Sequence, residues 1–182
     1  MRRTAILIGV NRYDDLAPLD SPHEDVHAIE RVLKANGHYN RVQPLLEPTR
    51  NEAMEALETA LSEGRPDDLL LVSFSGHGVK DKRGRLHLAL RDTRRKRLET
   101  TALSAEVLKR LLEDSRMRSK VLLLDCCHGG AFADGFATRS GGGEEAEPLD
   151  LERQLSDGAG TYVIAASGAL ELAREGDNRA GA

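Results

Sequence analysis

The chain has 182 residues, a length typical of one domain that buries a substantial core. With 40% hydrophobic and 31% charged residues, its composition excludes a disordered or fibrous protein and is typical of an ordinary globular one. The formal net charge of −4 argues against nucleic acid as a partner, and no apolar run approaches the roughly 20 residues that cross a bilayer. We therefore expect a single domain over residues 1–182, with no nucleic acid and no membrane among its partners.

Short apolar runs alternate along the chain with segments of helical periodicity. This alternation is typical of a mostly parallel sheet covered by helices on both faces. The predicted fold class is therefore α/β, a three-layer sandwich. Its strands are expected over residues 4–10, 41–46, 68–74, 120–125 and 161–166.

The apolar run at residues 5–10 is expected to be a buried strand rather than a secretory signal. It is short, and it continues into Asn11 and Arg12 without a small-residue cleavage site. The two cysteines of the chain, Cys126 and Cys127, are adjacent and cannot form an ordinary structural disulfide. These observations predict a cytoplasmic protein.

The first helix is expected to begin at Pro22 and to end near Gly37. Ser21 and Glu24 have the spacing of a capping box, in which each side chain accepts a hydrogen bond from the backbone of the other residue. This spacing predicts that Ser21 caps the helix.

Thr49 and Glu52 repeat that spacing before a second helix, which Gly64 is expected to end in the left-handed conformation. A third helix is expected over about residues 104–113.

Three stretches depart from the alternation. Residues 79–90 have a turn-like centre at 82–85 and predict a small hairpin at the rim of the sheet. The basic run from Arg94 to Arg97 is expected to be a solvated loop. Residues 133–160 contain a run of glycines and glutamates and are the most linker-like part of the chain.

Chemically active residues follow the third and fourth expected strands. The third runs into Ser-Gly-His-Gly, with His77 and Gly78, and the fourth into Asp-Cys-Cys-His-Gly-Gly, with Cys127. The carboxyl ends of neighbouring parallel strands form the crevice in which α/β proteins bind ligands, so His77 and Cys127 should face each other if their strands are adjacent. One imidazole can then generate a thiolate and protonate a departing amine. The backbone N–H groups of Gly78 and Cys127 could form an oxyanion hole.

These motifs resemble the pair found in metacaspases and bacterial caspase-like peptidases, which have Ser-Gly-His-Gly and Asp-Ser-Cys-His-Ser-Gly. The resemblance extends to about Ala173, and His77 precedes Cys127 by 50 residues, the separation typical of caspases. It implies a caspase-like fold and a cysteine endopeptidase with Cys127 as nucleophile and His77 as its acid/base partner. Cys126 takes the family's serine position and is expected to be a small buried apolar residue.

The resemblance also implies a pocket for a basic side chain, because metacaspases cut after arginine or lysine. The family's pocket acids match Asp125 and, within residues 19–26, Asp25, and Ser75 matches a serine that lines the same pocket. A carboxylate pair favours a guanidinium through bidentate, charge-assisted hydrogen bonds. The expected partners are therefore proteins or peptides with Arg or Lys before the cut. The alternative role for Asp25 is to stabilise the first turn of its helix through the helix dipole.

Other interpretations of the motifs match the sequence less well. A zinc site of His77, Cys126, Cys127 and His128 has adjacent cysteines, whereas structural zinc sites separate theirs by about two to four residues. A nucleotide-binding domain would carry a glycine-rich loop after the first strand, where residues 9–12 are Gly-Val-Asn-Arg. A catalytically inactive caspase-like interaction module stays open as the alternative function.

No metal or other cofactor is expected. Many metacaspases bind calcium, and Asp92 and Asp134 match two of the family's ligands. The paired aspartates that the family has near Leu103 and Ser104 are absent from this sequence. The resemblance therefore gives no firm basis for a calcium requirement.

The resemblance implies a six-stranded sheet, whereas the sequence supplies five core strands. We therefore expect the chain to be the catalytic large-subunit region, with a further strand and helices beyond Ala182 or in a separate chain. That segment and a regulatory or sensor protein are expected partners. Arg139 precedes Ser-Gly-Gly-Gly in the linker-like stretch of about 133–160 and is the expected self-processing site.

Overall fold

The structure is a computed structural model of the chain, and it describes residues 1–36, 38–127 and 160–166. Five parallel strands form its central sheet, in the order β2-β1-β3-β6-β7. Every expected strand is present, and the strand ends lie close to their expected positions except at the carboxyl end of β3. The strands are β1 (Arg3–Gly9), β2 (Arg41–Leu46), β3 (Leu69–Lys80), β6 (Ser119–Cys127) and β7 (Thr161–Ala166).

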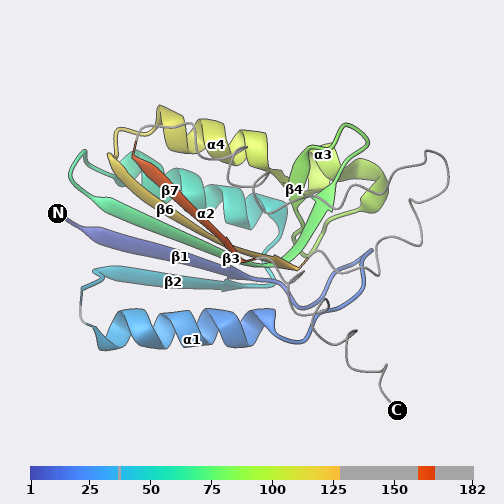
Figure 1. Cartoon of the computed structure of the whole chain (residues 1–182), viewed down its shortest axis with the longest axis horizontal. Helices are drawn as coiled ribbons and strands as arrows, with labels where there is room; N and C mark the ends of the chain where they lie inside the picture. Colours follow the sequence, from blue (N-terminus) through green and yellow to red (C-terminus); the bar gives the residue numbers. More distant parts are fainter. Residues whose placement is uncertain (37, 128–159, 167–182) are drawn as a thin grey trace, which may run out of the picture.

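Helices cover both faces of this sheet, so the predicted three-layer α/β sandwich is confirmed. The helix α1 lies on one face, and α2 and α4 lie on the other (Figure 1). Their bounds are Pro22–Ala35 for α1, Arg50–Glu63 for α2 and Ala105–Asp114 for α4. In the described part of the chain, no helix combines the length and the apolar character needed to cross a membrane.

The strand β3 extends six residues beyond its expected end at residue 74. Its last residues pair in antiparallel fashion with β4 (Leu86–Leu88), which pairs in turn with β5 (Leu103–Ser104). The predicted hairpin is therefore confirmed, but it continues a core strand instead of standing apart from it. Its turn is held by the Asp81 carboxylate, which accepts the N–H groups of Arg83 and Arg85 at 2.8 and 2.9 Å.

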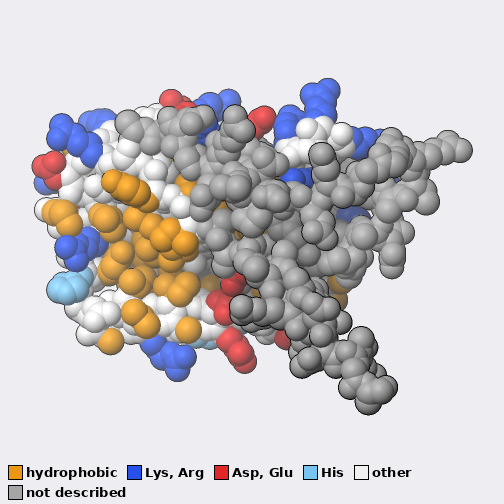
Figure 2. Space-filling model, viewed as in Figure 1, with side chains coloured by type: hydrophobic (Ala, Val, Ile, Leu, Met, Phe, Trp, Pro, Cys, Tyr) orange, Lys and Arg blue, Asp and Glu red, His pale blue; other side chains and the backbone are white. Residues whose placement is uncertain are grey.

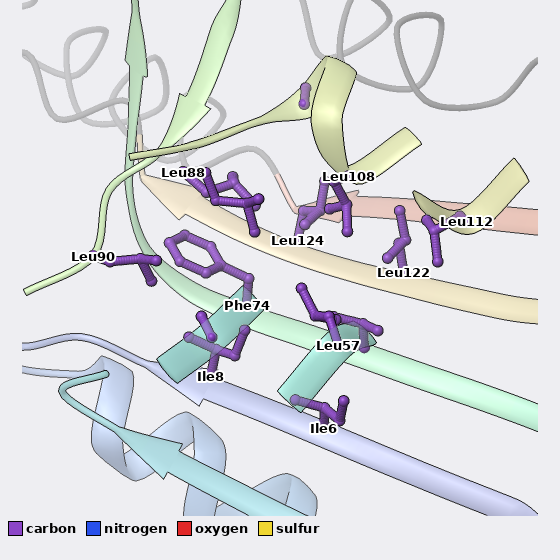
Figure 3. Close-up of a cluster of buried hydrophobic side chains, with 14 of the residues drawn as sticks. Ile6, Ile8, Leu57, Phe74, Leu88, Leu90, Leu108, Leu112, Leu122 and Leu124 are labelled. Atoms are coloured by element: carbon purple, nitrogen blue, oxygen red, sulfur yellow. The ribbon is translucent and has the colours of Figure 1, made fainter. Parts of the chain in front are cut away.

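Two apolar layers fill the spaces between the sheet and its helices. The larger layer joins alternate residues of β1, β3 and β6, such as Phe74 and Leu124, to Leu57 of α2 and Leu108 of α4 (Figure 3). The smaller layer packs Val26 of α1 against the opposite face of the sheet. Burying one such side chain stabilises the fold by about 1.5–3 kcal/mol relative to leaving it exposed. Because side chains of a strand alternate between faces, these layers fix which residues of β3 and β6 turn toward α1.

The strand β7 lies at the edge of the described sheet and pairs there with β6 alone. Hydrophobic side chains gather on the face of the molecule that carries this strand (Figure 2). Tyr162 and Ile164 of β7 are 69% and 59% exposed.

The helix ends confirm one capping box and contradict two other expectations. Thr49 and Glu52 exchange their hydrogen bonds as predicted. The side chain of Ser21, in contrast, does not cap α1, and the backbone of Ser21 is already helical. The side-chain oxygen of Asn11 instead accepts the N–H of His23 at 2.9 Å. Gly64 ends α2 in an extended conformation with φ −69°, so the left-handed cap is wrong. A Cβ on Gly64 would lie 2.3 Å from the sulfur of Met117, so close packing explains this glycine.

Candidate active site

The two sequence motifs meet at the carboxyl ends of β3 and β6. These strands are neighbours in the parallel sheet, which is the condition that the sequence argument required. Their register pairs Ser75 with Asp125 and His77 with Cys127. The structure describes Cys127 by its backbone, which ends β6 directly opposite His77.

The imidazole of His77 is buried, with 4% of the residue exposed. Its Nε2 lies 2.9 Å from the carbonyl oxygen of Ala17. A carbonyl oxygen only accepts hydrogen bonds, so Nε2 must carry a proton and donate it. In the neutral imidazole the lone pair is then on Nδ1. Burial lowers the pKa of His77, the bond to Ala17 raises it, and the positive charge of Arg95 lowers it further, with the net change downward.

Tyr13 holds the backbone of the same residue. Its hydroxyl accepts the N–H of His77 at 2.9 Å and donates to the carbonyl oxygen of Val10 at 2.9 Å. The two rings also lie against each other, with their centroids 4.9 Å apart. A Cβ at Gly76 would lie 2.9 Å from the Tyr13 hydroxyl oxygen, so the glycine before His77 permits this approach.

The loop that carries Tyr13 and Ala17 is anchored by Glu47. The Glu47 carboxylate accepts the backbone N–H groups of Asn11 and Arg12 at 3.0 and 3.1 Å. Its Oε1 also lies 2.7 Å from Nε2 of His23. Glu47 has a left-handed backbone with φ 54°, a conformation that costs a non-glycine residue free energy. The loop contacts therefore compensate for local strain.

The side chain of Cys126 lies in the core. Cys126 is 1% exposed and belongs to the same apolar layer as Leu122 and Leu124, so its expected burial is confirmed. Gly78 packs against it, since a Cβ on Gly78 would lie 3.1 Å from the Cβ of Cys126. A thiol in that position is out of reach of a substrate. Gly78 thus has a packing role, and its expected part in an oxyanion hole stays a prediction.

Three residues from distant parts of the chain form an acidic cluster beside His77. Ser75 of β3 donates its hydroxyl hydrogen to Asp25 of α1 at 2.7 Å. Asp125 is the direct partner of Ser75 in the adjacent strand. Burial raises the pKa of Asp125, and the nearby negative charge of Asp25 raises it further. A cation between two neighbouring carboxylates would be attracted by both of them.

The remaining residues singled out in the sequence lie away from this cluster or outside the described residues. Asp92 accepts the N–H of Arg50 at 2.9 Å and so caps the start of α2. Within the described ranges, no group of three or more His, Cys, Asp or Glu residues is arranged to hold a metal ion. His128, Asp134, Arg139 and the linker of about 133–160 lie outside the described residues.

Two contacts of His77, with Ala17 and Tyr13, and the anchoring of its neighbouring loop by Glu47 were not predicted from the sequence. The Ala17 carbonyl has no sequence signature, because every residue carries a carbonyl group. Glu47 directly follows β2, and Tyr13 lies four residues after the end of β1, so polar residues near the carboxyl ends of parallel strands were the one available signal.

Comparisons with known proteins show which family the chain resembles. The family model described as caspase domain matches residues 2–182. Metacaspase-1 of Candida albicans is 34% identical over 87 residues, which cover 42% of this chain and 19% of that protein. Metacaspase-1A of Neurospora crassa is 31% identical over 91 residues, which cover 44% of this chain and 20% of that protein. The matches thus span about a fifth of the length of these relatives.

The fold also has a counterpart among solved structures. A protein from Geobacter sulfurreducens matches with a TM-score of 0.57 and 18% sequence identity. The match covers 85% of this chain and 62% of that chain, and it indicates a shared fold.

Proposed function

The chain belongs to the caspase domain family, and on that premise we propose that it is a cysteine endopeptidase with Cys127 as nucleophile and His77 as acid/base partner. The observation that carries this proposal is the register of β3 and β6, in which His77 and Cys127 are direct partners. The burial of Cys126 in the core supports the choice of thiol.

The proposed chemistry uses one imidazole for two proton transfers. With the Nε2–H group held by Ala17, Nδ1 takes the proton of the Cys127 thiol. The thiolate bonds to the substrate carbonyl carbon, and the N–H groups of Gly78 and Cys127 stabilise the oxyanion. The imidazolium then protonates the departing amine as the C–N bond breaks. Water finally hydrolyses the thioester and regenerates the thiol.

The proposed substrates are proteins or peptides with Arg or Lys before the cut. The proposal rests on the acidic cluster of Asp25, Ser75 and Asp125. Ser75 and Asp125 stand two residues before His77 and Cys127 on β3 and β6, and Ser75 donates its hydrogen bond to Asp25. The hydrogen bond from Ser75 fixes the Asp25 carboxylate, so a guanidinium would meet preorganised acceptors. An aspartyl side chain would instead be repelled by both carboxylates.

Four variants and two peptides test the dyad and the pocket. Cys127→Ala and His77→Ala should abolish cleavage of an arginyl peptide, whereas Cys126→Ser, which restores the family residue, should retain most of it. An arginyl chloromethylketone should add covalently at Cys127, as detected by peptide mass mapping. Activity that survives in Cys127→Ala but is lost in Cys126→Ala would show that the thiol is wrongly chosen. Cleavage of an aspartyl peptide in preference to the arginyl one would refute the pocket.

Self-processing is the second part of the proposal. The chain is proposed to be a large-subunit region whose linker, at about 133–160, contains a processing site at Arg139. Arg139 offers the pocket its preferred side chain, and the small residues after it suit an extended cleft. Incubated wild-type protein should be cut after Arg139, and Cys127→Ala protein should stay intact. Equal cutting in both proteins, measured by intact mass, would exclude self-processing.

A further inference from the structure

One loop of the molecule meets both parts of the proposed site. It comprises residues 10–21 and joins β1 to α1 at the carboxyl ends of the parallel strands (Figure 1). The Ala17 carbonyl in this loop holds Nε2 of His77. The loop ends where α1 begins, and the first turn of α1 carries Asp25 of the acidic cluster. The path of this loop therefore matters to the dyad and to the pocket.

Packing and one long-range hydrogen bond fix the first half of the loop. The side chain of Leu16 is buried. The Asp15 carboxylate accepts the backbone N–H of Arg95 at 3.0 Å. Arg95 begins the short 3-10 helix η1 (Arg95–Arg97), which α3 (Leu98–Thr101) follows, so the basic run is exposed as expected but is partly helical. Both contacts lie before the carbonyl that meets the imidazole, so other residues must hold the return of the chain to α1.

Asn11 holds this return. Its side-chain nitrogen donates to the carbonyl oxygen of Asp20 at 3.0 Å, and its side-chain oxygen accepts the N–H of His23 at 2.9 Å. Its backbone oxygen accepts the N–H of Leu19 at 2.7 Å. Its own N–H donates to the Glu47 carboxylate at 3.0 Å. One residue thus ties the start of the loop to its end, to the end of β2 and to the first turn of α1.

The chemistry of the two side-chain bonds explains why this residue is asparagine. A backbone N–H only donates and a carbonyl oxygen only accepts, so the side chain must offer an acceptor and a donor at once. The amide turns its oxygen toward His23 and its nitrogen toward Asp20. Aspartate at this position would keep the acceptor and lose the donor, and alanine would lose both. Substitution can therefore separate the cap of α1 from the closure of the loop.

We propose that Asn11 is a positioning residue that aligns the imidazole of His77 with the carboxylate of Asp25. This inference rests on the proposed peptidase function and deepens it. The bond to Asp20 closes the loop just after the carbonyl that meets Nε2, and so holds that carbonyl in place. The bond to His23 holds the first turn of α1, two residues before the carboxylate of the pocket.

The Nε2–H proton of His77 reports the position of the Ala17 carbonyl without any substrate. A proton held in a buried hydrogen bond exchanges slowly with water. In protein with isotope-labelled histidine, NMR should show this proton in the wild type, and its exchange should be about tenfold faster in Asn11→Asp and Asn11→Ala. The bond to Ala17 raises the pKa of His77, so its weakening in Asn11→Ala should move the titration of the ring to lower pH.

Kinetics of an arginyl peptide separate positioning from stability. Asn11→Asp keeps the acceptor for the N–H of His23 and places a negative charge at the start of α1, which favours the helix, so Tm should not fall. Its kcat should nevertheless fall about tenfold, because two oxygen atoms now meet at Asp20. Asn11→Ala also releases the first turn of α1, so its KM should rise and its Tm should fall. A fully active Asn11→Asp, or a kcat that follows Tm across the two variants, would overturn the proposal.

Asn36 supplies the matched control. Its side-chain nitrogen donates to the carbonyl oxygen of Val32 at 2.8 Å, at the opposite end of α1. Asn36→Ala should lower Tm, as Asn11→Ala does, but it should leave kcat, KM and the exchange of the Nε2–H proton unchanged. Lost activity in this control would show that any weakening of α1 disables the site, which would contradict a specific role for Asn11.

The exchange measurement separates this inference from the peptidase proposal. If the wild type cleaves no peptide but the Nε2–H proton exchanges faster in the Asn11 variants than in Asn36→Ala, the peptidase proposal fails and the positioning role stands. Unchanged exchange in both Asn11 variants would refute the positioning role whatever the activity.

Discussion

Replacing Asp125 by Asn should weaken the proposed peptidase activity and stabilise the fold. Asn keeps the size of the carboxyl group and one acceptor oxygen but carries no charge. In the native chain, burial and the negative charge of Asp25 raise the pKa of Asp125. A carboxyl whose pKa is raised by folding holds its proton more tightly in the folded state, so its contribution to stability is present at low pH and declines as the pH rises through the folded pKa. At neutral pH the wild type carries this cost, and Asp125→Asn does not.

The effect on activity has the opposite sign. Asp125 is the direct strand partner of Ser75, whose hydroxyl group holds Asp25 at 2.7 Å, so the two carboxylates are proposed to share one guanidinium. Removing one charge from a partly desolvated pair should cost about 2 kcal/mol in transition-state stabilisation, which is about a 30-fold loss in kcat/KM. The same loss should develop in the wild type as the pH falls through the raised pKa of Asp125.

Two measurements on one pair of proteins check the reasoning. Thermal unfolding followed by circular dichroism should give a higher Tm for Asp125→Asn at pH 7, and the gain should shrink toward pH values below 3.8, the usual carboxyl pKa. Cleavage of an arginyl peptide should fall about 30-fold at pH 7. Asp67→Asn changes an exposed carboxyl group away from the site and should leave kcat/KM unchanged. A lower Tm at neutral pH, or undiminished cleavage, would refute this account of the pocket.

Three further substitutions probe the supports of the site and the fold. Tyr13→Phe removes the acceptor for the N–H of His77 and should lower kcat more than it changes KM, with about 1 kcal/mol lost in the free energy of unfolding by urea; an unchanged kcat would show that the hydroxyl does not position the histidine. Glu47→Ala removes the acceptor for the N–H groups of two loop residues and should lower both Tm and kcat, and Glu47→Gln should recover part of both. Equal Tm and kcat values in the two variants would argue against an anchoring role for Glu47. Gly64→Ala places a Cβ against Met117 and should cost about 1–3 kcal/mol of stability, a cost that Met117→Ala should relieve if close packing is its cause.

The secondary structure and the two chemical motifs were predictable from the sequence, because their signals are local. Alternating apolar runs marked the strands, and the spacing of Thr49 and Glu52 marked the start of α2. The motifs around His77 and Cys127 followed from residue types and their order along the chain. The residues of the acidic cluster were likewise predicted, through resemblance to a family.

Only the tertiary structure decided what surrounds these residues. The side chains that surround Cys126 depend on the register of β6 against β3 and on the apolar layer there, neither of which is a local property. The cap of α1 comes from Asn11 instead of Ser21, and the need for glycine at position 64 is explained by Met117, which lies far along the chain. The bond from His77 to the Ala17 carbonyl is the clearest case. Every residue has a carbonyl group, so its role arises from the path of the folded chain and leaves no mark in the sequence.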